Sequence, residues 1–218
     1  MESLPKNIHP SWNEYLLPLF QTDDMKKLKY EILPSINVEP ARDNIFRVFE
    51  TPLHDIKVVI LGQDPYPNGE ANGLAFAVNK DSVTPSSLTS IQEELFDDKT
   101  PSLRFASEWK TLEHWKEQGV FLLNTALTTE HGVKGAHLKL WQPFIKEVIH
   151  IISEHVGPTW LLWGRKAQDL AIPMVQKFAG PGRNAYFSAP HPVAHLYGKR
   201  DVSFIGCGHF KNLNNINW

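Results

Sequence analysis

Cysteine is almost absent from this chain of 218 residues, in which Cys207 is the only one. A single thiol cannot close an intramolecular disulfide, and it excludes a zinc site or an iron–sulfur cluster held by several cysteines. The lack of a disulfide framework fits a reducing compartment. We therefore expect a fold held together by its core, and we assign no role to Cys207.

Long apolar runs are also missing. No stretch approaches the roughly 18 consecutive apolar residues that a membrane-spanning helix needs. The N-terminal segment MESLPKNIHPSWNEY contains no apolar run of the signal-peptide type. We expect a protein without membrane association, located in the cytoplasm of a bacterium or otherwise inside a cell.

Charge of one sign is not in excess, since 22 basic side chains stand against 24 acidic ones. With a formal charge of −2 the whole protein does not attract polyanions, so any nucleic-acid site must be a local basic patch. The hydrophobic fraction of 42% is typical of a globular protein and excludes a disordered or fibrous chain. Because no linker, repeat or low-complexity segment divides the sequence, we predict one domain, 1–218.

Short apolar runs separated by helix-like segments predict the fold class. Four continuous runs indicate strands that are covered on both faces: 57–61 (KVVIL), 120–123 (VFLL), 159–163 (TWLLW) and 185–187 (AYF). Helical spacing is present in 43–49, in 88–95 behind Ser87 as a helix cap, and in 141–152 with Pro143 in the first turn. The pattern predicts an α/β three-layer sandwich with a central, mainly parallel four-stranded sheet flanked by helices.

Polar or ring-bearing residues follow each of the four predicted strands. The following segments are GQDPYP after the first, Asn124-Thr125 after the second, Gly164-Arg165-Lys166 after the third and SAPHP (188–192) after the fourth. In open α/β sheets, ligands bind beyond the carboxyl ends of the strands. We therefore expect these groups to converge on one edge of the sheet.

Taken singly, these residues have ordinary structural explanations. Asp64 before proline is common turn chemistry, and Asn124 at a strand end suits a cap or a turn. His191 between two prolines is compatible with a simple loop histidine, and Phe76 in GLAFAV with a core residue. Their order and spacing together favour a functional site.

The combined motifs resemble those of the family 1 uracil-DNA glycosylases. The resemblance covers nearly the whole chain, in order: GQDPY (62–66), GLAFAV (73–78), PSSL (85–88), LLNTALT (122–128), LLWGRKAQ (161–168), the final loop PHPVAHLYG (190–198) and a terminal INW. It implies a monofunctional glycosylase that flips uracil out of DNA and hydrolyses its N-glycosidic bond, leaving an abasic site in base-excision repair. It also implies a monomer acting on uracil-containing DNA without metal or cofactor, and it raises a proteinaceous inhibitor as a further candidate partner.

The resemblance also implies a role for particular residues. Asp64 would orient the water and His191, as a neutral imidazole, would donate to the departing base; these two would be catalytic. The uracil would be bound by Gln63 through its main chain, by Tyr66 as a barrier to the thymine methyl group, by Phe76 as a stacking platform and by Asn124 at the base edge. The DNA would be held by Ser86, Ser87, Gly164, Arg165 and Ser188, with Leu196 as the wedge that fills the gap left by the flipped base.

The sequence departs from the family pattern in two functional loops. Pro67 stands where the family usually has histidine, and His191-Pro192-Val193-Ala194-His195-Leu196 replaces His-Pro-Ser-Pro-Leu. His195 is consequently a competing candidate for the wedge. These departures leave open a non-catalytic DNA-binding or protein-docking module on a glycosylase scaffold. A glycosylase for another damaged base is a further alternative, although Tyr66 and Asn124 argue against it.

Overall fold

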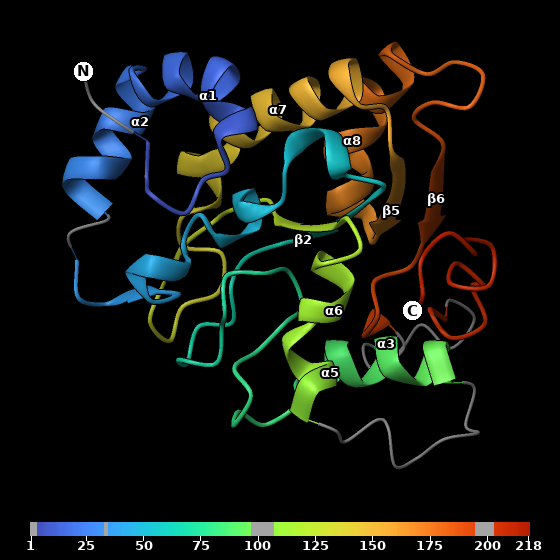
Figure 1. Cartoon of the computed structure of the whole chain (residues 1–218). Coiled ribbons are helices and arrows are strands. Elements are labelled where there is room, and N and C mark those ends of the chain that lie inside the picture. The colour runs from blue at the N-terminus through green and yellow to red at the C-terminus, as the bar shows by residue number, and fades with distance from the viewer. Residues whose placement is uncertain (1–3, 33–34, 97–106, 195–202) are drawn as a thin grey trace.

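A four-stranded parallel sheet lies at the centre of the computed structural model, which describes residues 4–32, 35–96, 107–194 and 203–218 (Figure 1). The strands are β2 (Val58–Gly62), β3 (Val120–Asn124), β5 (Thr159–Trp163) and β6 (Tyr186–Ala189), in the order β3-β2-β5-β6. All three neighbouring pairs are parallel. Each strand covers one of the apolar runs to within two residues, so the predicted sheet is confirmed.

Burial separates β2 and β3 from the edge strand β6, in which only Ala189 is buried. Every residue of β2 and β3 is buried, as a strand covered by helices on both faces requires. Val58 pairs with Val120 on one side and with Thr159 on the other, and Gly62 lies opposite Asn124. This register brings the carboxyl ends of β2, β3 and β5 to the same edge. A separate two-stranded antiparallel ribbon joins β1 (Val38–Glu39) to β4 (Thr129–Glu130).

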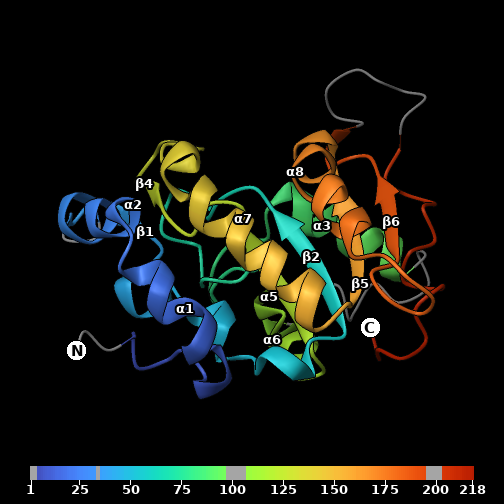
Figure 2. The ribbon, with the colours of Figure 1, turned by 90° about the horizontal axis from the view of Figure 1, so that it is seen from above.

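Helices cover both faces of the sheet. They are α1 (Asn13–Phe20), α2 (Asp23–Lys27), α3 (Ser86–Phe96), α5 (Ser107–Thr111), α6 (Glu113–Lys116), α7 (Leu138–His155) and α8 (Arg165–Lys177), with 3-10 turns η1 (Pro10–Trp12), η3 (Arg42–Asn44), η4 (Arg47–Glu50) and η5 (Leu53–Asp55) and a π turn η2 (Leu28–Ile32). Viewed from above, α7 and α8 cross in front of the sheet, while α3, α5 and α6 lie behind it (Figure 2). The three-layer prediction is therefore confirmed.

The helix expected over 43–49 is wrong. The segment instead forms the two short turns η3 and η4, because Phe46 between them adopts φ −103° and ψ 16°, outside the α-helical region. Its apolar residues Ile45, Phe46, Val48 and Phe49 are nonetheless all buried. The hydrophobic spacing thus identified core residues but not the element that carries them.

Two helix starts also differ from expectation. Ser87 is not the cap of α3, because the helix already begins at Ser86 and the Thr89 N–H bonds to the carbonyl of Pro85. Pro143 is not in the first turn of α7, which begins at Leu138 and carries this proline inside the helix. Neither helix has the expected boundary, since apolar spacing does not mark the first turn of a helix.

Tryptophan side chains fill the largest buried positions, and most of their indole N–H groups have a partner. Trp12 donates to the carbonyl of Thr51 at 2.9 Å, Trp141 to the Thr128 hydroxyl at 2.7 Å and Trp160 to the Asn184 amide oxygen at 3.1 Å. These bonds satisfy polar atoms that would be costly to bury alone. The three indole rings, from η1, α7 and β5, belong to one hydrophobic core.

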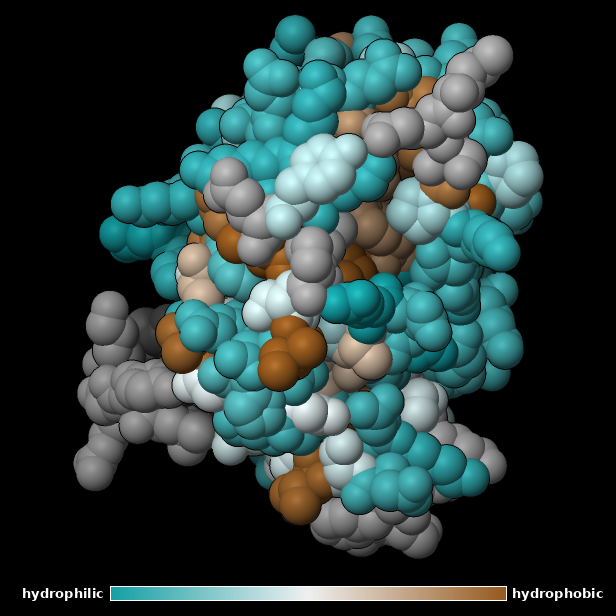
Figure 3. Space-filling model, turned by 90° about the vertical axis from the view of Figure 1, so that its left-hand side faces the viewer, coloured by the Kyte–Doolittle hydropathy of each residue, from teal (hydrophilic) through white to brown (hydrophobic). Residues whose placement is uncertain are grey.

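The surface shown in Figure 3 is mainly hydrophilic. It has one hollow lined by hydrophobic residues, and elsewhere on this face the hydrophobic side chains are isolated from one another. Isolated exposed hydrophobic residues are usual on protein surfaces and indicate no particular interface. Among the described residues, none of the helices combines the length and the apolar character required to cross a membrane.

Candidate active site

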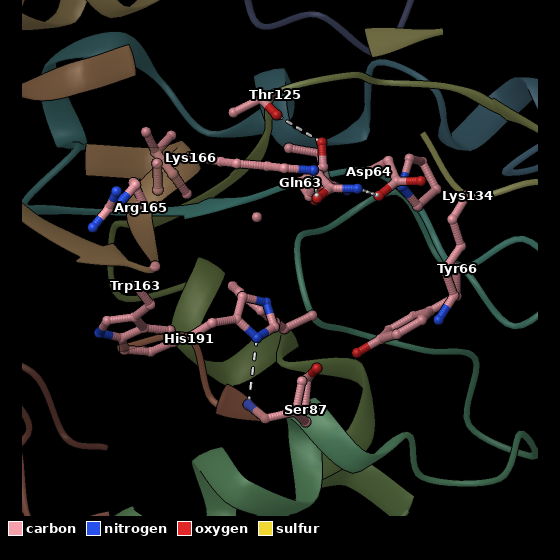
Figure 4. Close-up of a pocket in the computed structure, with 18 of the residues that line it drawn as sticks. Gln63, Asp64, Tyr66, Ser87, Thr125, Lys134, Trp163, Arg165, Lys166 and His191 are labelled. Atoms are coloured by element: carbon pink, nitrogen blue, oxygen red, sulfur yellow. Dashed lines mark hydrogen bonds between the residues drawn. The ribbon is translucent and has the colours of Figure 1, made fainter. Parts of the chain in front are cut away.

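A cavity of about 410 Å³ opens at the carboxyl-end edge of the sheet. It is lined by residues 61–67, Phe76, Ser87, Asn124, Thr125, Lys134, residues 163–167, His191 and Val193. The segments that leave β2, β3, β5 and β6 thus all reach it, as predicted from the polar residues that follow these strands. Figure 4 shows their side chains converging on one space.

Most of the predicted site residues lie together in this cavity. Those that line it are Gln63, Asp64, Tyr66, Phe76, Ser87, Asn124, Gly164, Arg165 and His191. Ser86 does not line it and is exposed at the first residue of α3, and Ser188 is exposed on the edge strand β6. Leu196 and its competitor His195 lie outside the described residues.

Asp64 is half-buried and both of its carboxylate oxygens accept hydrogen bonds. Oδ1 accepts from Nε2 of Gln63 at 2.9 Å (Figure 4), and Oδ2 accepts from the backbone N–H of Gly135. The main chain before it is fixed, because the Gln63 carbonyl accepts from the Thr125 hydroxyl at 2.8 Å and from the Ala126 N–H at 3.0 Å. The carboxylate is therefore held in one orientation by two different loops.

His191 faces the cavity as a neutral donor. Its Nδ1 accepts a hydrogen bond from the Val193 N–H at 3.3 Å, which places the proton of the neutral ring on Nε2. Burial, and secondarily the positive charge of Lys166, lowers the pKa of His191 below its ordinary value. Gly164, at φ +91°, allows this approach, because a Cβ there would lie 3.0 Å from the Cβ of His191.

Aromatic rings form one wall of the cavity. Phe76 adopts a left-handed backbone conformation with φ 65°, and its ring centroid lies 5.6 Å from that of Trp163 and 6.2 Å from that of His191. The Tyr66 hydroxyl is buried, and burial raises the pKa of this phenol, an effect that the neighbouring Ser87 hydroxyl partly opposes. Both rings are held in place and present apolar surface to a planar ligand.

Asn124 presents an unused hydrogen-bonding group. The side chain is only 4% exposed, and its Oδ1 has no hydrogen-bond partner among the described residues. It packs against Gly62 of the neighbouring strand, where a Cβ would collide with the amide oxygen and with Ala75. A buried acceptor without a partner costs about 1–3 kcal/mol, so the position suits a ligand that supplies an N–H.

Three cationic side chains line the cavity: Lys134, Arg165 and Lys166. Arg165 and Lys166 come from the segment after the third predicted strand, which was expected at this edge, whereas the sequence did not indicate Lys134, nor Trp163 as a site residue. Lys134 lies in the loop between β4 and α7, which no motif assigned to the site. The approach of this loop to Asp64, which accepts a hydrogen bond from the N–H of the next residue, Gly135, appears only once the chain is folded.

The described residues contain no group of three or more histidine, cysteine or acidic side chains that could hold a metal ion. The fold and the cavity together define an α/β protein with a slot for a planar hydrogen-bonding ring, bordered by a carboxylate, a neutral imidazole and three cations. The chain belongs to the uracil DNA glycosylase superfamily, whose family model matches residues 49–216.

Individual relatives agree with this assignment. The chain is 36% identical to a uracil-DNA glycosylase from Fusobacterium nucleatum over 93% of this chain and 84% of the relative. It is 42% identical to one from Azobacteroides pseudotrichonymphae over 95% and 92%. Among solved structures, mimivirus uracil-DNA glycosylase matches with a TM-score of 0.76 and 26% identity, over 89% of this chain and 72% of that one. A mimivirus UNG variant in complex with UGI matches with a TM-score of 0.74 and 26% identity, over 88% of this chain and 73% of that one.

Proposed function

We propose that this protein is a monofunctional uracil-DNA glycosylase, which hydrolyses the bond between uracil and deoxyribose in base-excision repair and leaves an abasic site. Family membership supports the reaction. The observation that carries the assignment to residues is the convergence of Asp64, Asn124 and His191 on one cavity. Residues 1–218 act in this proposal as a single domain, supported by a core that extends from Ile8 to Ile216.

The base is selected inside the slot after it has left the helix, a step that costs a few kcal/mol of pairing and stacking. The buried Oδ1 of Asn124 accepts from uracil N3–H, while the amide NH₂ donates to O4. Cytosine presents the opposite pattern at these two positions and leaves polar groups unpaired. Phe76 stacks on the base, a contribution of about 1–3 kcal/mol. Tyr66 occupies the space that the thymine methyl group needs.

Cleavage of the bond between uracil and deoxyribose creates a positive and a negative charge, and the site contains one side chain that stabilises each of them. The sugar becomes positively charged as the bond breaks, and Asp64 opposes that charge and orients the attacking water. Uracil leaves as a delocalised anion, and the Nε2–H of His191 donates to its O2 as the negative charge grows there. A donor held in place before the reaction stabilises the transition state without reorganisation, and losing one typically costs about 10²–10³ in rate.

The phosphate groups of the DNA backbone are bound by residues at and around the mouth of the cavity. Gly164 and Arg165 lie at the N-terminus of α8, where backbone N–H groups and a cation favour phosphate. Ser87 lines the cavity, and the exposed Ser86 and Ser188 reach phosphates outside it. Leu196 remains the proposed wedge. Binding through these contacts weakens as salt concentration rises.

The same assignment also leads to proposals about the oligomeric state, the location and a protein partner. We propose that the protein works as a monomer inside the cell. A relative is known in complex with UGI, and we propose that a proteinaceous inhibitor of that kind recognises the DNA-binding residues around the cavity of this protein as well.

The proposal is tested with oligonucleotides that carry a single uracil, cytosine or thymine, in single- and double-stranded form and in the presence of EDTA. We expect an alkali-labile site at uracil only. Binding of uracil-containing DNA without any alkali-labile product would contradict glycosylase activity and would favour the non-catalytic module. Release of a different damaged base, with uracil left intact, would contradict the uracil specificity.

A further inference from the structure

Lys166 connects helix α8 to the catalytic loop that follows β2. Its Nζ donates to Oε1 of Gln63 at 2.8 Å, and Nε2 of the same amide donates to Oδ1 of Asp64 at 2.9 Å. Figure 4 shows the extended Lys166 side chain meeting Gln63 beside Asp64. The three residues therefore form a chain of two hydrogen bonds that ends on the proposed catalytic carboxylate.

The chemistry of the three groups fixes the direction of both bonds. An ammonium group can only donate, so it requires the oxygen of the Gln63 amide to face it. The NH₂ group of that amide then faces the other way, toward the carboxylate, which can only accept when ionised. Without Lys166, rotation of the amide by 180° would turn an oxygen toward Asp64 and replace an attraction with a repulsion.

We propose that Lys166 is a positioning residue, whose ammonium group sets the orientation of the Gln63 amide and through it the orientation of the Asp64 carboxylate. This inference rests on the proposed function and adds a residue to its machinery. The alternative role for Lys166 is a simple contact to a DNA phosphate, as its place next to Arg165 among the cations that line the cavity suggests.

The residues at both ends of this pair of hydrogen bonds are attached to rigid parts of the fold. Lys166 is the second residue of α8, and the side chain of Gln168 ties this turn to the sheet by donating to the carbonyls of Leu162 at 3.1 Å and Ala189 at 2.9 Å. The buried Ala167 fixes the rotation of the helix. Gln63 is anchored to the exit of β3 through its own carbonyl. The hydrogen bonds from Lys166 through Gln63 can therefore determine where the Asp64 carboxylate lies.

A second observation places Lys166 in the same electrostatic environment as the other proposed catalytic group. After burial, its positive charge is the further cause that lowers the pKa of His191. Removing this charge should let the pKa of His191 rise. The same residue thus influences the carboxylate by hydrogen bonding and the imidazole by its charge.

The experiment compares Lys166→Met with Lys166→Arg and with Lys177→Met, which removes a lysine from the opposite end of α8. If Lys166 orients Gln63, Lys166→Met lowers kcat about threefold to tenfold, the loss expected for one solvent-exposed hydrogen bond, and leaves KM and the salt dependence of binding nearly unchanged. Lys166→Arg keeps a donor and recovers most of kcat. Lys177→Met leaves all three quantities unchanged.

A double variant tests whether the effect passes through Gln63. In a Gln63→Leu background there is no amide to orient, so adding Lys166→Met should have no further effect on kcat at a pH well above the pKa of His191, where loss of the Lys166 charge leaves the ring neutral. Equal losses from Lys166→Met in both backgrounds would overturn the inference. So would an unchanged kcat with a raised KM and a salt slope reduced by about one, which identify a phosphate contact.

An NMR measurement separates this inference from the proposed function. The Nε2 resonances of Gln63 and the titration of His191 can be followed whether or not uracil is released. We expect Lys166→Met to shift the Gln63 resonances and to raise the pKa of His191. Unchanged signals overturn the positioning role even in an active glycosylase, whereas shifted signals in a protein that releases no uracil support the positioning role and refute the proposed function.

Discussion

The amide oxygen of Asn124 lies against the Cα atom of Gly62 on the neighbouring strand, where a Cβ could not fit. The two residues are opposite each other at the carboxyl ends of β3 and β2. The absence of a side chain at Gly62 is therefore what allows the Asn124 amide to occupy its position in the lining of the cavity. Any larger residue at this position must displace Asn124 or the strand itself.

Gly62→Ala should consequently disable uracil recognition. The added methyl group would push the Asn124 amide out of register, and losing one or two buried hydrogen bonds of about 1–3 kcal/mol each lowers kcat/KM by at least about tenfold. Gly180→Ala is the matched control, because nothing lies within 4 Å of a Cβ there. Steady-state excision and thermal unfolding of both variants check this prediction. Normal excision by a folded Gly62→Ala protein would contradict it.

Asn124→Asp should admit cytosine. The substitution replaces an NH₂ donor with an oxygen that can accept from the cytosine amino group, so it changes the hydrogen-bonding pattern with little change in shape. We expect cytosine release from an oligonucleotide in which the wild-type protein leaves cytosine intact. A variant that loses uracil activity and still ignores cytosine would show that Asn124 does not read the base edge.

Tyr66→Ala should admit thymine by opening the space for its methyl group. Tyr66→Phe is the control, since it keeps the ring and removes only the buried hydroxyl. We expect thymine release from the alanine variant alone, measured on a thymine-containing duplex. Release of thymine by the phenylalanine variant as well would show that the Tyr66 hydroxyl group, and not its ring, excludes thymine.

The activity should fall on the acid side of neutrality. Burial and Lys166 lower the pKa of His191, so the ring stays neutral down to a pH below its ordinary value of 6.5. When it does take up a proton, Nδ1 becomes a donor and can no longer accept from the Val193 N–H. We therefore expect kcat/KM to be level near pH 7 and to decline as the pH falls through the lowered pKa. A decline that begins above pH 7 and follows the NMR titration of His191 would contradict the neutral-imidazole role.

The strands and the main site residues could be predicted because their signals are local. Three buried strands, β2, β3 and β5, read as uninterrupted apolar runs, and the polar residues that follow each run must meet at one edge of a parallel sheet. The fourth run was located correctly, but the expectation that it is covered on both faces was wrong, because β6 is an edge strand with only Ala189 buried. Residues 42–50 show the limit of the same reasoning, since helical spacing was present but Phe46 leaves the helical region. Burial was predictable there, and backbone conformation was not.

Other parts of the site depend on contacts between distant segments. The Gly135 N–H reaches Asp64 across 71 residues of sequence, and Lys166 reaches Gln63 across 103. Nothing in the residues around Lys134 and Gly135 marks them as part of a site. Such contacts are set by how the loop between β4 and α7 folds over the sheet edge, which sequence spacing does not reveal.

The central claim is that Asp64 and His191, held on the same cavity, perform the chemistry of uracil release. Single-turnover excision with enzyme in excess measures that chemistry without product release, for the wild-type protein, Asp64→Asn and His191→Ala. We predict that each substitution slows the single-turnover rate by at least about 10²-fold while the unfolding temperature changes little. Single-turnover rates close to that of the wild-type protein in both variants would contradict the assignment of the active site.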